Sequence, residues 1–201
     1  MLVQTSSQLL HKLDPQQLPL SSKVVALLGP SQHTQLHRLI LQLLFTHASR
    51  GERVGVIVGD NHFDAYHLAR LARAHDFNPV ELLAQIDLSR PFTCHQLHHS
   101  ILMVEALKHK WGALYVPGFL SLFYDEDVKY AEVTRLLKAS LKCLKQMAVQ
   151  GLPVLVTLSP PPAESTRREF VEIVVNAADM YWKPSEVVLA RLVPQQMEFT
   201  I

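Results

Sequence analysis

The chain has 201 residues, of which 48% are hydrophobic and 18% charged, so it can fold around a core and is not a disordered chain. Its formal net charge of +1 excludes a uniformly basic surface, so nucleic-acid binding would need a local patch. No apolar run is long enough for a membrane span, and the first residues lack the layout of a signal peptide.

The first half of the chain alternates strands and helices. Residues 1–22 are expected to be a lead-in, and residues 23–201 a single domain. Apolar runs predict strands over 24–28 and 54–60. Helical periodicity predicts helices over about 32–49, over 64–75 and from Pro79 onward.

The second half continues this alternation. Strands are predicted near 86–89, 113–118 and 152–158. Helices are predicted at about 94–110, 128–149 and 164–176. The tail from Met180 to Ile201 is expected to add two or three strands. Together these elements predict a three-layer α/β fold with a mostly parallel sheet, whose C-terminal strands form an antiparallel edge.

Residues 23–44 have the strand–loop–helix layout of a P-loop, in which Gly-x4-Gly-Lys-[Ser/Thr] wraps phosphate groups. Counted without gaps from Gly29, the second glycine corresponds to Thr34 and the lysine to the residue after it. With a loop two residues shorter, Gln32, His33 and Thr34 take the places of Gly-Lys-Thr. Neither register supplies a lysine. His33 is either a protonatable phosphate contact or, as expected here, a solvent-exposed loop residue.

Three ordered segments resemble the core of the RecA-type ATPases, on the branch of the archaeal RadA recombinase. Residues 21–43 are similar to the family's strand, P-loop and helix, including a Thr-Gln-Leu that begins at Thr34. Residues 59–86 are similar to its Asp-Thr-Glu-Gly-x-Phe segment and place Asp60 at the catalytic glutamate. Residues 88–96 resemble a third family segment through Arg90 and Phe92. The resemblance implies a RecA-like P-loop NTPase fold.

The departures from the family indicate a lost activity. The family's Walker B strand ends in an aspartate that holds magnesium, whereas the matching strand here runs into Pro117-Gly118. Phosphoryl transfer depends almost entirely on positioning and charge stabilisation. We therefore expect a pseudo-ATPase without a cofactor, with ATP binding lost or weak. Gly29, Gln32, His33, Thr34 and Asp60 form the degenerate site, and Asp60 either polarises a water or is idle.

The resemblance also implies two loops that contact single-stranded DNA. The first, residues 123–135, offers Lys129, Tyr130 and Arg135. The second, residues 159–170, offers Arg167 and Arg168. Cations beside an aromatic platform suit sequence-tolerant binding of single strands. The alternative is an ordinary helix face beside a loop stiffened by prolines.

Cysteines and histidines predict no metal centre. Cys94 and Cys143 form no disulfide framework, which favours a reducing, cytoplasmic setting. His95 and His99 have the helical spacing of a zinc pair, but two ligands on one helix do not complete a site. A solvated helix face is the expected structure there.

The leading functional hypothesis is a non-catalytic recombinase paralogue. It would act as an accessory or mediator in DNA recombination or repair, as a homo-oligomer or with a RecA-like ATPase paralogue, contacting single-stranded DNA and no membrane. Two alternatives remain open: a KaiC-like regulatory scaffold without a nucleic-acid role, and a divergent ATP-binding protein.

Overall fold

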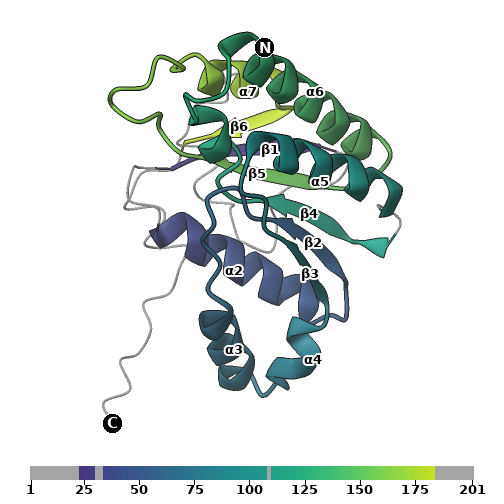
Figure 1. Cartoon of the computed structure of the whole chain (residues 1–201). Coiled ribbons are helices and arrows are strands. Elements are labelled where there is room, and N and C mark those ends of the chain that lie inside the picture. The colour runs from purple at the N-terminus through teal and green to yellow at the C-terminus, as the bar shows by residue number, and fades with distance from the viewer. Residues whose placement is uncertain (1–22, 30–33, 108–109, 184–201) are drawn as a thin grey trace.

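Six parallel strands form one sheet in the order β3-β2-β4-β5-β1-β6 (Figure 1). The computed structural model describes residues 23–29, 34–107 and 110–183. The strands are β1 (Val24–Leu28), β2 (Val54–Ile57), β3 (Ile86–Ser89), β4 (Ala113–Val116), β5 (Val154–Leu158) and β6 (Met180–Trp182). Every neighbouring pair is parallel, which requires a crossover between consecutive strands.

Helices supply these crossovers and cover both faces of the sheet (Figure 1). One face carries α2 (Thr34–Ala48), α3 (Ala65–Ala74) and α4 (Pro79–Leu83). The other carries α5 (Cys94–Leu107), α6 (Tyr130–Val149) and α7 (Phe170–Ala177). The three-layer α/β fold is therefore confirmed. A short 3-10 helix, η3 (Ser121–Tyr124), was not expected from the sequence.

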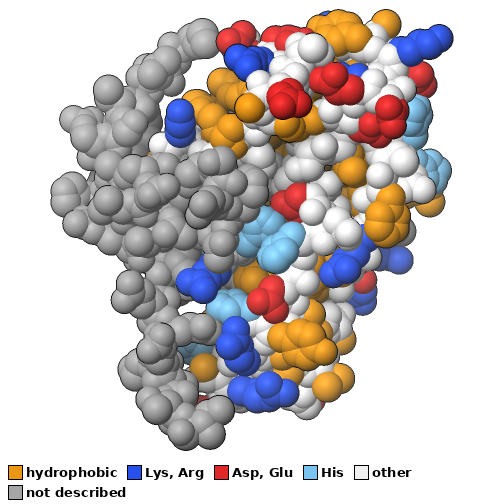
Figure 2. Space-filling model, turned by 60° about the vertical axis from the view of Figure 1, so that its left-hand side comes forward, with side chains coloured by type: hydrophobic (Ala, Val, Ile, Leu, Met, Phe, Trp, Pro, Cys, Tyr) orange, Lys and Arg blue, Asp and Glu red, His pale blue; other side chains and the backbone are white. Residues whose placement is uncertain are grey.

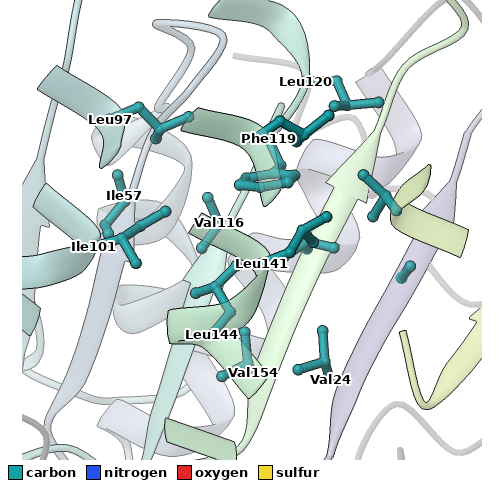
Figure 3. Close-up of a cluster of buried hydrophobic side chains, with 14 of the residues drawn as sticks. Val24, Ile57, Leu97, Ile101, Val116, Phe119, Leu120, Leu141, Leu144 and Val154 are labelled. Atoms are coloured by element: carbon teal, nitrogen blue, oxygen red, sulfur yellow. The ribbon is translucent and has the colours of Figure 1, made fainter. Parts of the chain in front are cut away.

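Each face of the sheet has its own hydrophobic core. Figure 3 shows the core under α5 and α6, where Leu97 and Ile101 from α5 meet Leu141 and Leu144 from α6. These side chains lie over Val116 and other residues of the central strands. The strands β1, β4 and β5 are buried along their whole length, which explains their almost entirely apolar sequences.

The expected antiparallel edge is not supported. β6 pairs in parallel with β1, from Val25 opposite Met180 to Leu27 opposite Trp182. The reason is the α7 crossover, which returns the chain to the amino end of β1 instead of folding it back in a hairpin. Asp179 holds this return, because its carboxylate accepts a hydrogen bond from the Val24 amide at 2.8 Å. The rest of the expected tail, residues 184–201, lies outside the described residues, as does the expected lead-in, residues 1–22.

Helix α7 begins at Phe170, six residues after the start predicted from the sequence. The preceding residues form a loop, because their polar groups bond elsewhere: Glu126 accepts hydrogen bonds from both the amide and the hydroxyl of Thr166. Among the described helices, none combines the length and the apolar character that crossing a bilayer demands.

Candidate functional site

The candidate site lies where the strands end. The helices that follow β1 and β2 cover one face, and those that follow β4 and β5 cover the other. After the neighbouring strands β1 and β5 the chain therefore turns toward opposite faces of the sheet, and it does the same after β2 and β4. Such places are called switch points, and parallel α/β sheets bind their ligands there. At each of them one backbone bond extends the pairing, from Gly29 N to Leu158 O at 3.1 Å and from Gly59 N to Pro117 O at 2.8 Å.

At β2/β4 the two chain segments approach each other closely through glycines. A Cβ added to Gly59 would lie 2.5 Å from the Gly118 carbonyl oxygen, a backbone atom. Gly118 has a φ of +63°, and a Cβ there would lie 2.4 Å from Cβ of Asp60. Only glycine fits at either position without a shift of the backbone. This close approach holds Asp60 over the end of β4.

The Asp60 carboxylate is already occupied by protein groups. One oxygen lies 3.1 Å from Nε2 of His37, in the second turn of α2, and the other accepts the amide of His62 at 3.1 Å. The rings of His37 and His62 meet edge to face with centroids 4.5 Å apart. The side chains of Asp60 and His37 are only 15% and 12% exposed, so the pair lies mostly within the protein. A metal ion would have to displace these contacts.

A small cavity adjoins this pair. It measures about 10 Å³ and is lined by His37, His62 and Asp64, together with Ile40, Leu41, Phe63 and Pro117. That is room for about one water, whereas small-molecule pockets measure several hundred Å³. His37 comes from α2, and His62 comes from the loop after β2. The protein's own side chains therefore fill the β2/β4 switch point.

The predicted P-loop residues are only partly described. Gly29 is buried, and a Cβ on it would lie 2.1 Å from the side chain of Leu36. The side chain of Leu36 therefore occupies the space that a larger residue at position 29 would need. Gln32 and His33 lie outside the described residues. Thr34 begins α2.

Arg167 does not occupy the position expected for a DNA contact. Its side chain is 3% exposed, and its guanidinium donates to the carbonyl oxygens of Phe123 (2.8 Å), Asp125 and Val128. The Phe123 carbonyl belongs to η3, and those of Asp125 and Val128 belong to the loop between η3 and α6. Arg167 therefore fastens the loop after β5 to the segment that follows β4. Since its donors are directed at backbone oxygens, we correct the expectation that it faces a phosphate.

The other predicted DNA contacts are exposed at the start of α6 and beside α7. Lys129, Arg135 and Arg168 are exposed. Tyr130 is 52% exposed and donates its hydroxyl to Glu169 at 2.7 Å. The structure thus brings the two loops together, and contact of these four residues with DNA stays a prediction.

Carboxylates surround these cations. They come from both loops and from α6: Asp125, Glu126, Asp127, Glu132, Glu164 and Glu169. The hydrogen bond from the Thr166 amide holds the pKa of Glu126 below its ordinary value, and the bond from His95 does the same for Glu132. Both groups stay ionised near neutral pH. The local potential is therefore unfavourable for a phosphate backbone.

The histidines at the start of α5 are engaged with α6. Nε2 of His95 lies 2.8 Å from Glu132, and Nδ1 of His98 lies 3.0 Å from the hydroxyl of buried Ser140. His98 is thus half-buried and not part of a solvated face, and burial lowers its pKa. Over the described ranges no three histidine, cysteine or carboxylate side chains form a group that could hold a metal ion.

His37 and His62 are the site residues that sequence reasoning missed. The sequence did hold a signal for His37. It lies three residues after Thr34, near the start of α2, and this end of the helix lies beside the carboxyl ends of the strands. Nothing in the sequence indicated that its partner would be Asp60, 23 positions away.

The fold is a three-layer α/β fold with an all-parallel sheet, and protein side chains fill the switch point between β2 and β4. Neither protein-family models nor curated proteins match the chain when its sequence is compared with them.

Proposed function

We propose that the chain is a non-catalytic RecA-like paralogue that acts as an accessory in DNA recombination or repair. It would pair with a second copy or with a RecA-type ATPase through the edge at the carboxyl ends of its strands. Support comes from the resemblance of three sequence segments and from a parallel sheet in which those segments follow β1, β2 and β3.

The observation that carries the proposal is the His37–Asp60 contact. A phosphoryl-transfer site needs cations on the phosphates and a carboxylate free to hold magnesium or water. Here the carboxylate at the end of β2 has protein partners on both oxygens, β4 ends in Pro117-Gly118, and residues 29–36 contain no lysine. An edge built in this way suits a protein contact better than a nucleotide.

Pairing is tested with two single charge changes at opposite edges of the sheet. His62→Glu places a carboxylate beside Asp60 at the carboxyl edge, whereas Arg50→Glu alters an exposed residue at the amino edge. The mass of the full chain would be measured by light scattering, alone and with RecA-type ATPases from the same source. We expect a complex that His62→Glu weakens and Arg50→Glu leaves intact.

A chain that stays monomeric and binds no such ATPase would overturn the proposal. Equal weakening by both variants would remove the carboxyl edge as the interface.

A second candidate is an interaction scaffold without a nucleic-acid role, of the KaiC-like kind. The carboxylates around Lys129 and Arg168 favour it. Pairing without any binding of single-stranded DNA would distinguish this scaffold from the recombination accessory.

A further inference from the structure

Helix α3 carries an exposed aromatic residue and two arginines on one line. Tyr66, Arg70 and Arg73 are spaced i, i+4 and i+7, which places them on one face of the helix. We call these three residues the α3 stripe. All three are exposed, and Tyr66 is 87% exposed, the highest value among the large hydrophobic side chains of the described ranges. The fold itself gains little from a tyrosine in that position.

Two further arginines flank the α3 stripe. Arg38 of α2 is exposed and lies near His67 of α3. Burial lowers the pKa of His67, and the charges of Arg70 and Arg38 act in the same direction. Arg90, after β3, reaches the carbonyl of Phe63 just before α3, at 3.5 Å. Arg38 therefore lies close enough to α3 to act on His67, and Arg90 lies beside the segment that leads into α3.

Two carboxylates that precede the α3 stripe in the sequence already have protein partners. Asp60 contacts His37, and Asp64 caps α3 by accepting the His67 amide at 2.8 Å. Asp76 lies beyond the far end of the helix. None of the ion pairs in the described part of the chain involves Arg38, Arg70, Arg73 or Arg90.

Charge is unevenly distributed over this side of the molecule. In Figure 2 the carboxylate side chains gather near the top, whereas several Lys and Arg side chains lie lower on the same face, beside exposed hydrophobic groups. The carboxylate-rich part contains the loops after β4 and β5, which carry Lys129 and Arg168. A polyanion approaching this face would be drawn away from those loops and toward the arginines.

We propose that the α3 stripe, with Arg38 and Arg90, is a binding site for single-stranded nucleic acid. Arginines contact the phosphates, and the ring of Tyr66 offers a flat surface on which an unpaired base stacks. An acidic peptide would use the same cations, but it would have no need of an exposed aromatic ring. The inference rests on the proposed role in recombination or repair, and it moves the DNA contact from the two loops to α3.

The test is fluorescence anisotropy of a labelled oligothymidine titrated with the full chain at low and moderate salt. Arg70→Gln combined with Arg73→Gln is expected to weaken binding on the order of tenfold and to reduce the salt slope by about 1.4, the value for two lost phosphate contacts. Tyr66→Leu is expected to weaken binding roughly tenfold through lost stacking.

The matched control is Lys138→Gln combined with Lys142→Gln, two exposed cations at i and i+4 on α6. It removes the same charge and should leave binding within about twofold of the unaltered chain if the site is local. All variants change exposed side chains, and circular dichroism would confirm that each is folded.

Three results would contradict the inference. If the α3 variants bind like the control while the unaltered chain binds, the site is elsewhere and the proposed function stands. If the unaltered chain binds no oligonucleotide at low salt, the DNA contact fails, and the pairing experiment still decides the accessory role. If Tyr66→Leu has no effect and polyglutamate competes as well as DNA, the surface is one for acidic peptides.

Discussion

At the scale of single residues, Asp60 and Gly118 explain why protein side chains fill the carboxyl edge of the sheet between β2 and β4. Gly118 has the left-handed φ that favours glycine, and its missing side chain leaves the space in which Asp60 lies. Asp60 then reaches His37, and the two groups satisfy each other. Asp60, which was expected from the sequence either to polarise a water or to be idle, is therefore a packed and hydrogen-bonded side chain in the structure.

Gly118→Ala should be strongly destabilising. The left-handed φ costs an alanine about 1–2 kcal/mol, and the clash with Asp60 adds about 1–3 kcal/mol. Gly51→Ala is the control, because Gly51 has a φ of +74° but nothing within 4 Å of its added Cβ. Urea denaturation should show the larger loss for Gly118→Ala, and equal losses would mean that Asp60 does not press on this position.

Arg167 and its neighbour provide a second matched pair. Arg167→Met should cost on the order of 3 kcal/mol, because it leaves buried carbonyl oxygens without donors. Arg168→Met, at an exposed side chain, should stay within about 0.5 kcal/mol. Chemical denaturation of both variants checks this difference. Similar values for the two would contradict the structural role of Arg167.

At the scale of elements, the loops after β4 and β5 behave as one unit. Arg167 extends from the second loop to three carbonyls of the first, and Glu126 extends from the first to Thr166 of the second. These bonds set the late start of α7 and keep the 159–169 segment out of the helix. Periodicity alone predicted a longer helix, because Glu164 to Glu169 are ordinary helix formers when no partner competes for them.

Histidines packed between elements should make stability depend on pH. Burial lowers the pKa of His67 in α3 and of His98 in α5 below the ordinary value of 6.5. The unfolded chain therefore binds more protons than the folded chain as the pH falls below about 6.5, and stability is lost on acidification. The stabilising effect of the neutral rings is complete above that pH.

The double variant His67→Gln, His98→Gln removes both titrating rings. Its unfolding free energy, measured by urea denaturation from about pH 7.5 to pH 5, should fall less steeply than that of the unaltered chain. An unchanged slope would mean that neither histidine is held neutral by the fold.

At the scale of the whole molecule, the sequence was informative about most of the strands and helices that depend on local pattern. Apolar runs predicted β1 to β5, and helical spacing predicted the helices that cover them. The direction of β6 was wrong, because it depends on where α7 returns the chain. The partners of Asp60 and Arg167 could not be predicted either, since each contact joins segments that only the folded sheet brings together.

The distribution of charge also belongs to this scale. A net charge of +1 conceals an acidic region around the loops after β4 and β5 and a group of arginines around α3. Composition could indicate that a nucleic-acid contact must be local, but not which face would carry it.

The central proposal, that this edge of the sheet does not bind a nucleotide, is tested most directly by titration with a fluorescent ATP analogue, with and without Mg²⁺. We expect no saturable binding at micromolar analogue and no effect of Mg²⁺, because Asp60 is paired with His37 and no lysine follows Gly29 in the loop. Micromolar binding that requires Mg²⁺ and is displaced by ATP would contradict the claim, and it would make this chain a divergent nucleotide-binding protein.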